Sequence, residues 1–300
     1  MKRLCALIAG LSVALAQAAT FVDDNGRKLE LAAPAQRVIT LAPNLTEFVY
    51  AVGAGATLVG TVDTSNHPHE AQAVPRIGDY QRLDIERVLT LKPDLVLAWL
   101  SGNTNREMAQ LEAAGLHLFY LEPRKLDDVP RALARVGALL GHAAEGERGA
   151  ARLRRELAAL QASHAAAPPV TVFFQVWSQP LMTLNDDHLV GEVIALCGGR
   201  NVFGKLPQLV PQLSAESVLA ADPQAMFSAA ESDTPAAHWR RDPQHRAFAV
   251  WQQFPRLTAV RRGWLYSIPG DTISRQGPRI IDGARAMCAA LDEVRAESRR

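Results

Sequence analysis

The chain alternates between short apolar runs and longer amphipathic stretches over most of its length. Apolar runs at residues 37–41, 58–62 and 95–98 are short enough to be strands buried on both faces, and helix-forming stretches separate them. The alternation resumes with a run at residues 170–176. This strict alternation predicts an α/β protein whose sheets are mainly parallel and covered by helices.

One unit of this pattern occurs twice, at residues 83–98 and again at residues 213–228. Each copy has a helix-capping residue, a glutamate in the first turn, a Val-Leu pair, a proline and an apolar run. Similarity at a fixed spacing is typical of a repeat, with a chance match as the alternative. The repeat predicts two similar lobes that carry Glu86 and Glu216 at equivalent places.

The middle of the chain differs, because residues 127–166 are almost all helix formers, interrupted only around Gly141-His142. Residues 143–165 would form a helix roughly 35 Å long at about 1.5 Å per residue. We therefore predict two Rossmann-like lobes joined by one long rigid helix. The predicted N-terminal lobe, connecting helix and C-terminal lobe comprise residues 19–142, 143–167 and 168–300.

Local signals predict the remaining elements. The Asn25-Gly26 dipeptide predicts a hairpin within residues 20–31. Ala42-Pro43-Asn44 is expected to break the chain before the next helix. The other predicted helices cover residues 46–52, 105–114, 188–196, 247–253 and 277–295, and a loop is predicted at residues 177–180.

The first residues have the pattern of a secretory signal peptide. Lys2 and Arg3 precede an apolar run at residues 4–16, and a small-x-small sequence ends at Ala18. The run is too short to cross a bilayer, which argues against the alternative of a membrane anchor. We predict that residues 1–18 are a signal peptide and that it is cleaved near Ala18 on export.

Export has a consequence for the cysteines. Cleavage would remove Cys5 and leave Cys197 and Cys288 in an oxidising compartment. Two cysteines in such a compartment most simply pair, so we predict a Cys197–Cys288 disulfide that ties the C-terminal helix to the second lobe. Two separate buried thiols are the alternative.

Charge and motifs argue against several classes of function. The formal net charge of +1 gives no electrostatic support for binding nucleic acid. The sequence has no Gly-x-Ser-x-Gly elbow, no His-Glu-x-x-His, and no phosphate-binding Gly-x-x-x-x-Gly-Lys followed by Ser or Thr. It also has no clustered set of His, Asp and Glu. We predict a monomer that is not an enzyme, with no catalytic residues and no metal site.

Several stretches resemble the class III periplasmic binding proteins, which serve ABC importers. The stretches that carry this similarity are residues 37–43, 46–47, 86–96, 196–203 and 275–280. Trp99, Gly102 and Asn103 resemble the equivalent residues of the members that bind cobalamin, and the cysteines Cys197 and Cys288 also resemble that group. The resemblance implies a periplasmic protein that captures cobalamin, or a related corrinoid, between its lobes and delivers it to an inner-membrane ABC transporter.

The same resemblance implies roles for individual residues. Glu86 and Glu216 would dock on the membrane subunits of the transporter; their alternative role is to stabilise a helix N-terminus. A corrinoid is a large amphipathic disc, so its cleft needs aromatic walls and polar groups at the rim. At that rim, Asp271 and Arg275 would contact amides of the ligand or form a local ion pair. The residues expected to contact ligand are Thr64, Tyr80, Trp99, Trp177, Asp271 and Arg275.

Two of these positions depart from the pattern of the cobalamin-binding members. Thr64 stands where those proteins have a tyrosine, and Tyr80 stands where they have a tryptophan. Haem is therefore the main alternative ligand and a siderophore a further one, because haem-binding relatives use a tyrosine close to Tyr80 as axial ligand, here with Arg82 nearby. His67 and His69 could also ligate a metal, although such a loop is more often solvated.

Overall fold

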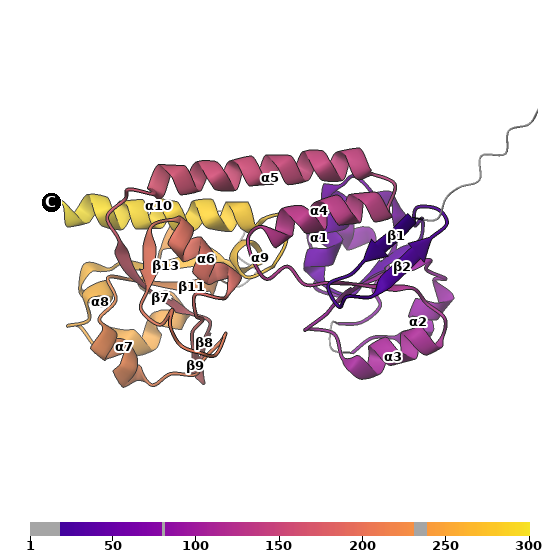
Figure 1. Cartoon of the computed structure of the whole chain (residues 1–300). Helices are drawn as coiled ribbons and strands as arrows, with labels where there is room; N and C mark the ends of the chain where they lie inside the picture. Colours follow the sequence, from indigo (N-terminus) through magenta and orange to yellow (C-terminus); the bar gives the residue numbers. More distant parts are fainter. Residues whose placement is uncertain (1–18, 80–81, 231–238) are drawn as a thin grey trace, which may run out of the picture.

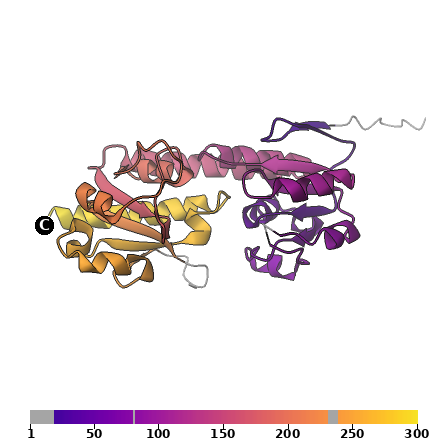
Figure 2. The same cartoon turned by 90° about the horizontal axis from the view of Figure 1, so that it is seen from below.

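The computed structural model describes residues 19–79, 82–230 and 239–300 of the chain. Its strands form two larger, mainly parallel sheets and two small hairpins. Figure 1 shows two α/β lobes side by side, with helix α5 (Ala143–His164) running along both, and Figure 2 shows the same two lobes from below. The fold class predicted from the sequence is confirmed, while the proposed signal peptide lies outside the described residues.

The N-terminal lobe contains a four-stranded parallel sheet in the order β4-β3-β5-β6. An antiparallel hairpin, β1 (Ala19–Val22) and β2 (Lys28–Leu31), precedes it and confirms the turn predicted at Asn25-Gly26. The remaining elements of this lobe are β3 (Val38–Thr40), α1 (Pro43–Ala51), η1 (Gly55–Thr57), β4 (Leu58–Thr61), η2 (His69–Ala73), α2 (Ile85–Thr90), β5 (Leu95–Trp99), α3 (Asn105–Ala113), β6 (Leu118–Leu121) and α4 (Asp128–Leu139).

The C-terminal lobe contains a five-stranded sheet in the order β10-β7-β11-β13-β12, in which only the edge strand β12 is antiparallel. Its elements are β7 (Val170–Gln175), β8 (Trp177–Ser178), β9 (Leu181–Met182), α6 (Leu189–Leu196), β10 (Gly199–Asn201), α7 (Ala215–Ala221), β11 (Ala225–Ala230), β12 (Arg240–Arg241), η3 (Arg246–Gln253), α8 (Thr258–Arg262), β13 (Leu265–Pro269), α9 (Gly270–Ile273) and α10 (Ile280–Ser298).

The repeated stretch occupies the same place in both sheets. Helix α2 leads into β5 and helix α7 into β11, and each of these strands lies third in its sheet order. The residue before the proline has a positive φ in both copies, 47° at Lys92 and 37° at Asp222. A positive φ is uncommon outside glycine, so its recurrence at the two equivalent positions supports a true repeat.

The residue after each proline ties the repeated strand to its neighbour. The Asp94 carboxylate accepts hydrogen bonds from the backbone N–H groups of Gln36 and Arg37, at 2.8 and 2.9 Å. At the equivalent place, the side-chain oxygen of Gln224 accepts one from the N–H of Thr171, at 2.9 Å. Both contacts lie at the start of the adjacent strand, so the repeated unit sets the same strand register in each lobe.

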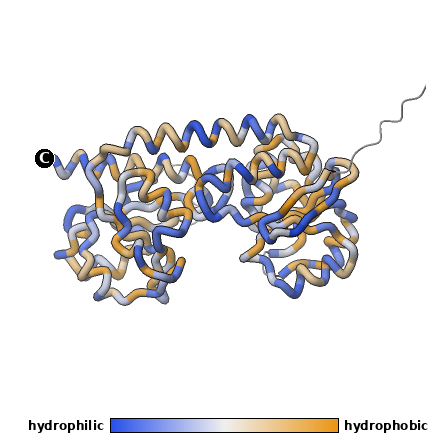
Figure 3. The backbone as a smooth tube through the Cα atoms, in the orientation of Figure 1, coloured by the Kyte–Doolittle hydropathy of each residue, from blue (hydrophilic) through white to orange (hydrophobic). Residues whose placement is uncertain are grey.

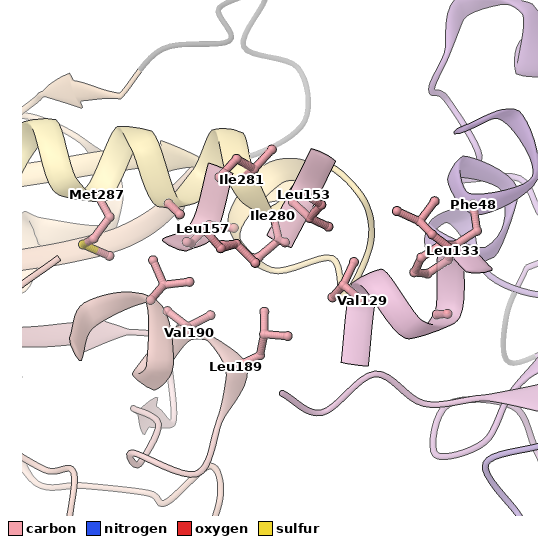
Figure 4. Close-up of a cluster of buried hydrophobic side chains, with 14 of the residues drawn as sticks. Phe48, Val129, Leu133, Leu153, Leu157, Leu189, Val190, Ile280, Ile281 and Met287 are labelled. Atoms are coloured by element: carbon pink, nitrogen blue, oxygen red, sulfur yellow. The ribbon is translucent and has the colours of Figure 1, made fainter. Parts of the chain in front are cut away.

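The two lobes share one hydrophobic core. Figure 4 shows it extending from Phe48 and Leu133 in the N-terminal lobe, past Leu157 of α5, to Ile281 and Met287 of α10. Polar residues alternate with apolar ones along α5, which therefore keeps one face in water (Figure 3). Because the core is continuous, the lobes are joined by packing as well as by the predicted connecting helix.

Several predicted boundaries are wrong, each for a local reason. Helix α1 begins at Pro43 rather than residue 46, since proline at the first helical position loses no hydrogen bond. The stretch around 247–253 is a 3₁₀-helix. The predicted loop at 177–180 is the tight hairpin between β8 and β9. Helix α10 begins at Ile280, after Gly277 and Pro278.

The predicted disulfide is confirmed. The Sγ atoms of Cys197 and Cys288 lie 2.00 Å apart and link the C-cap of α6 to the middle of α10. Both cysteines are buried within the shared core. Across the described ranges, no helix combines the length and the apolar character that a membrane span requires.

Candidate functional site

Loops that follow strands of the two lobes meet between the lobes. In the N-terminal lobe, strands β3, β4 and β5 run parallel, so the chain leaves all three at the same edge of the sheet. In the C-terminal lobe, the chain after β13 forms α9 and a loop that reaches across to the other lobe. There, the Asn66 amide donates a hydrogen bond to the Asp271 carboxylate at 3.1 Å. This junction is the candidate ligand site.

Trp99 ends strand β5 and is held in place by the residues that follow it. Its backbone N–H donates to the side-chain oxygen of Asn103 at 2.7 Å. The Asn103 amide in turn donates to the carbonyl oxygen of Leu41 at 3.0 Å, which joins the loops after β5 and β3. The half-buried indole of Trp99 also packs against the shared core. The Trp-x-x-Gly-Asn sequence therefore fixes one aromatic side chain at the edge of the sheet.

Gly102 is required for this arrangement. A Cβ atom at this position would lie only 1.9 Å from Cε3 of the Trp99 indole, far closer than carbon atoms can approach. The indole therefore lies directly against the backbone of Gly102. A side chain of any size there would displace the ring.

We expect Gly102→Ala to move the Trp99 indole and to change the tryptophan emission spectrum of the folded protein. The matched control is Gly149→Ala, because a Cβ at Gly149 meets only Leu133, at an ordinary 3.8 Å. The measurement is the emission maximum of each variant, with circular dichroism as a check on folding. An unchanged spectrum in a folded Gly102→Ala protein would contradict the close packing.

The other expected ligand residues differ widely in their surroundings. Trp177 lies in the β8–β9 hairpin, where the residue is 61% exposed and its indole N–H donates to the carbonyl oxygen of Gln179 at 2.9 Å. Thr64 is exposed, and its carbonyl oxygen accepts a hydrogen bond from Arg275 at 3.3 Å. Tyr80 lies outside the described residues. The structure thus brings Thr64 together with Arg275.

Asp271 and Arg275 form an ion pair, which is one of the two roles expected for them from the sequence. A terminal nitrogen of Arg275 lies 2.8 Å from Oδ1 of Asp271, one helical turn before it. The side chains are 17% and 14% exposed. Arg275 also donates to the side-chain oxygen of Asn66 at 2.8 Å. The pair is therefore only partly local, because it also contacts the loop after β4.

A buried glutamate completes this cluster, and the sequence analysis did not assign it to the site. The Glu47 side chain is 2% exposed and lies 3.1 Å from a nitrogen of Arg275. Arg279 donates two parallel hydrogen bonds to the same carboxylate, at 3.0 and 2.6 Å. One signal could have identified it: Glu47 falls between apolar residues of a short helix, where a carboxylate needs a positively charged partner.

The charges in the cluster influence one another. Burial lowers the pKa of Arg279, but the hydrogen bond and charge of Glu47, together with the charges of Asp271 and Asp282, hold it above its ordinary value. His67 keeps part of its surface in water, but its partial burial lowers its pKa, and the positive charge of Arg279 lowers the pKa further. His67 is therefore neutral at pH 7 and adds no charge to the cluster.

The paired glutamates lie far from this junction. Glu86 and Glu216 are exposed in the first turns of α2 and α7, which lie on the side of the molecule away from α5 (Figure 1). Asp84 and Ser214 cap these two helices, accepting from backbone N–H groups at 3.0 and 3.3 Å. Hydrogen bonds from its own N–H and from Ser214 lower the pKa of Glu216. Both side chains thus stabilise helix starts while facing solvent.

Metal ligands are sparse in this region. Within residues 19–79, 82–230 and 239–300, no group of three or more His, Cys, Asp or Glu side chains is placed to hold a metal ion. His67 and His69 are both exposed on either side of Pro68. Arg82, the predicted neighbour of a haem ligand, is also exposed.

Comparison with known proteins identifies the family. A family model described as periplasmic binding protein matches residues 38–272. The chain belongs to the periplasmic binding protein family. The resemblance stated from the sequence is therefore confirmed, and the family consists of binding proteins rather than enzymes.

Individual relatives agree over most of their length. A vitamin B12-binding protein from Pectobacterium atrosepticum is 35% identical over 267 residues, covering 87% of this chain and 90% of the relative. The crystal structure of the periplasmic vitamin B12-binding protein of Vibrio cholerae is 32% identical, with a TM-score of 0.75, and covers 87% of this chain and 98% of that chain. A periplasmic haem-binding protein from Pseudomonas aeruginosa is 26% identical, with a TM-score of 0.71 and coverage of 85% and 92%.

Proposed function

We propose that this protein captures cobalamin between its two lobes and delivers it to an inner-membrane ABC transporter. The observation that carries the proposal is the similarity to vitamin B12-binding proteins along nearly the whole chain. The proposed contacts have the chemistry that a corrinoid needs: an aromatic side chain from each lobe, Trp99 and Trp177, and the polar residues Thr64, Asp271 and Arg275. Tyr80 is the remaining proposed contact.

The protein acts by binding alone and returns its ligand unchanged, without a catalytic residue. Membership of a family of periplasmic binding proteins supports a periplasmic location, reached by cleavage of a signal peptide near Ala18. The mature chain works as a monomer. Its proposed parts are the lobes at residues 19–142 and 168–300 and the connecting helix at residues 143–167.

The membrane subunits of the importer dock on the α2 and α7 side of the molecule. Glu86 and Glu216 are exposed, occur at equivalent positions of the repeat, and lie on the same side of the protein. A transporter with two similar membrane subunits presents two similar sites, which suits one carboxylate on each lobe. Charged pairs of this kind set orientation and association rate at protein interfaces.

Titration of the mature protein with cyanocobalamin should show one-to-one binding that is about tenfold weaker in Trp99→Ala. The loss follows from removing one aromatic wall of the cleft. Trp99→Phe should lose less, because it keeps a stacking face. The measurement combines tryptophan quenching with the visible spectrum of the ligand. Absence of cobalamin binding by the unaltered protein would refute the proposed ligand.

Haem is the second candidate, favoured by the similarity in sequence and fold to a haem-binding protein. The same titration with haemin distinguishes the two ligands. If only haemin binds, with a tyrosinate-type spectrum that Tyr80→Phe abolishes, the ligand is haem, and the fold and family are unaffected.

A further inference from the structure

A buried carboxylate lies at the centre of the cluster that joins the lobes, beside the contacts that Asn66 makes with Asp271 and Arg275. Glu47 comes from α1 of the N-terminal lobe, whereas Arg275 and Arg279 come from the C-terminal lobe, more than two hundred residues later. Oε1 of Glu47 accepts from both arginines, at 3.1 and 2.6 Å, and Oε2 accepts from Nε of Arg279 at 3.0 Å. Charge-assisted, bidentate contacts of this kind are directional, so they fix the relative position of the groups they join.

Two positive and two negative side chains balance within this cluster. Asp271 adds the second negative charge and lies 2.8 Å from Arg275. All four side chains are at most 20% exposed. Loss of one partner would leave an uncompensated charge in a poorly solvated place, so the cluster is stable only when both lobes contribute to it.

The N-terminal side of the cluster rests on a rigid base. Thr40, Thr46, Thr61 and Ser65 are fully buried, and their hydroxyl groups form a closed hydrogen-bond network with distances of 2.7 to 3.0 Å. Thr46 immediately precedes Glu47, and Ser65 immediately precedes Asn66. The network therefore holds in place both N-terminal side chains that Arg275 contacts.

We propose that Glu47 is a positioning residue for the ligand site. Through Arg279 it fixes the separation of the lobes, and through Arg275 it fixes the Arg275–Asp271 pair within the proposed ligand site. That site is thereby preformed, and ligand binding does not have to order it. The effect through Arg275 on the ligand site rests on the proposed function, whereas the effect through Arg279 concerns the lobes alone.

The proposal is tested at Arg279 rather than at Arg275, because Arg279 donates two hydrogen bonds to Glu47 and is not among the proposed ligand contacts. Arg279→Met keeps much of the aliphatic length of the side chain but removes both hydrogen bonds to Glu47. Arg279→Lys keeps the positive charge but cannot form the bidentate contact with the carboxylate. The matched control is Arg285→Met on α10, the helix that begins directly after Arg279; the Arg285 side chain is 50% exposed and pairs with Glu156 of α5. The two variants and the control should share the fold of the unaltered protein by circular dichroism.

The first readout is the distance between the lobes, measured by pulsed electron paramagnetic resonance with spin labels on Thr90→Cys and Ala220→Cys. These exposed residues are equivalent positions of the repeat, one on each lobe. We expect a narrow distribution in the unaltered protein and the Arg285→Met control. The distribution should be broader in Arg279→Met and intermediate in Arg279→Lys. A distribution in Arg279→Met as narrow as in the control would overturn the proposal.

The second readout is cobalamin affinity, which should fall about tenfold in Arg279→Met, less in Arg279→Lys, and not in Arg285→Met. Broader distances with unchanged affinity would show that the cluster fastens the lobes without positioning the ligand contacts, and would overturn the positioning role. If the unaltered protein does not bind cobalamin, the proposed function fails, and the distance measurement still decides whether Glu47 and Arg279 fix the lobes.

Discussion

Replacement of both Cys197 and Cys288 by alanine should lower the free energy of unfolding by about 4–5 kcal/mol in the chain-entropy model. The physical reason is the length of the loop that the disulfide closes, since the cysteines are 91 residues apart in sequence. An unfolded chain without this link gains many conformations. The measurement is urea-induced unfolding followed by circular dichroism, on the double variant and the oxidised parent protein.

The location of the disulfide adds to the expected effect. It joins α6 to α10, and α10 begins directly after the Arg275–Arg279 loop that contacts Glu47. Reduction of the parent protein in denaturant supplies a control that leaves the sequence unchanged. A loss below about 1 kcal/mol in both experiments would show that the link does little to limit the unfolded chain.

The features that could be predicted from the sequence are those fixed by neighbouring residues. The Asn25-Gly26 turn, the capped starts of α2 and α7, and the long helix α5 depend on local conformational preference and on apolar spacing. The disulfide was predictable for a different reason, because the predicted cleavage of a signal peptide leaves two cysteines, and two cysteines allow only one intramolecular pair.

The features that could not be predicted depend on contacts between distant parts of the chain. Glu47 and Arg279 are 232 residues apart, and no spacing rule connects them. The shared core was also missed, because the stripe on α5 indicates that the helix is buried on one face but not that both lobes cover it. The helix starts at Pro43 and Ile280 differ from the predicted ones, because proline and glycine permit more than one boundary.

The residues of the candidate site also separate into those that could be predicted from the sequence and those that could not. Trp99 and Gly102 could be named together from their sequence, and the structure supplies the reason, since the indole lies against the glycine backbone. Asp271 and Arg275 could be named as candidate polar contacts of a ligand, which stays a prediction. That they also join the lobes follows only from the position of Asn66 and Glu47, which the fold of the other lobe determines.

Reversal of both charges, with Glu86→Arg and Glu216→Arg, should abolish transport of cobalamin while leaving its binding to the protein unchanged. Both carboxylates are exposed in the first turns of α2 and α7 and take no part in the contacts of the junction between the lobes, so reversing their charges should leave the proposed ligand site intact. The introduced arginines would then face positive charges on the membrane partner, and this repulsion would prevent docking. The measurement is uptake into vesicles that contain the cognate importer, with the binding titration in parallel.

A matched control makes the same change in net charge elsewhere. Glu30→Arg with Glu147→Arg reverses two exposed charges on β2 and α5, and should leave transport intact. Single reversal of Glu86 or Glu216 should reduce transport less than the pair, because each contacts a separate membrane subunit in the proposed complex. If the double variant transports normally, the two glutamates serve only to stabilise the starts of α2 and α7, and docking must use another surface.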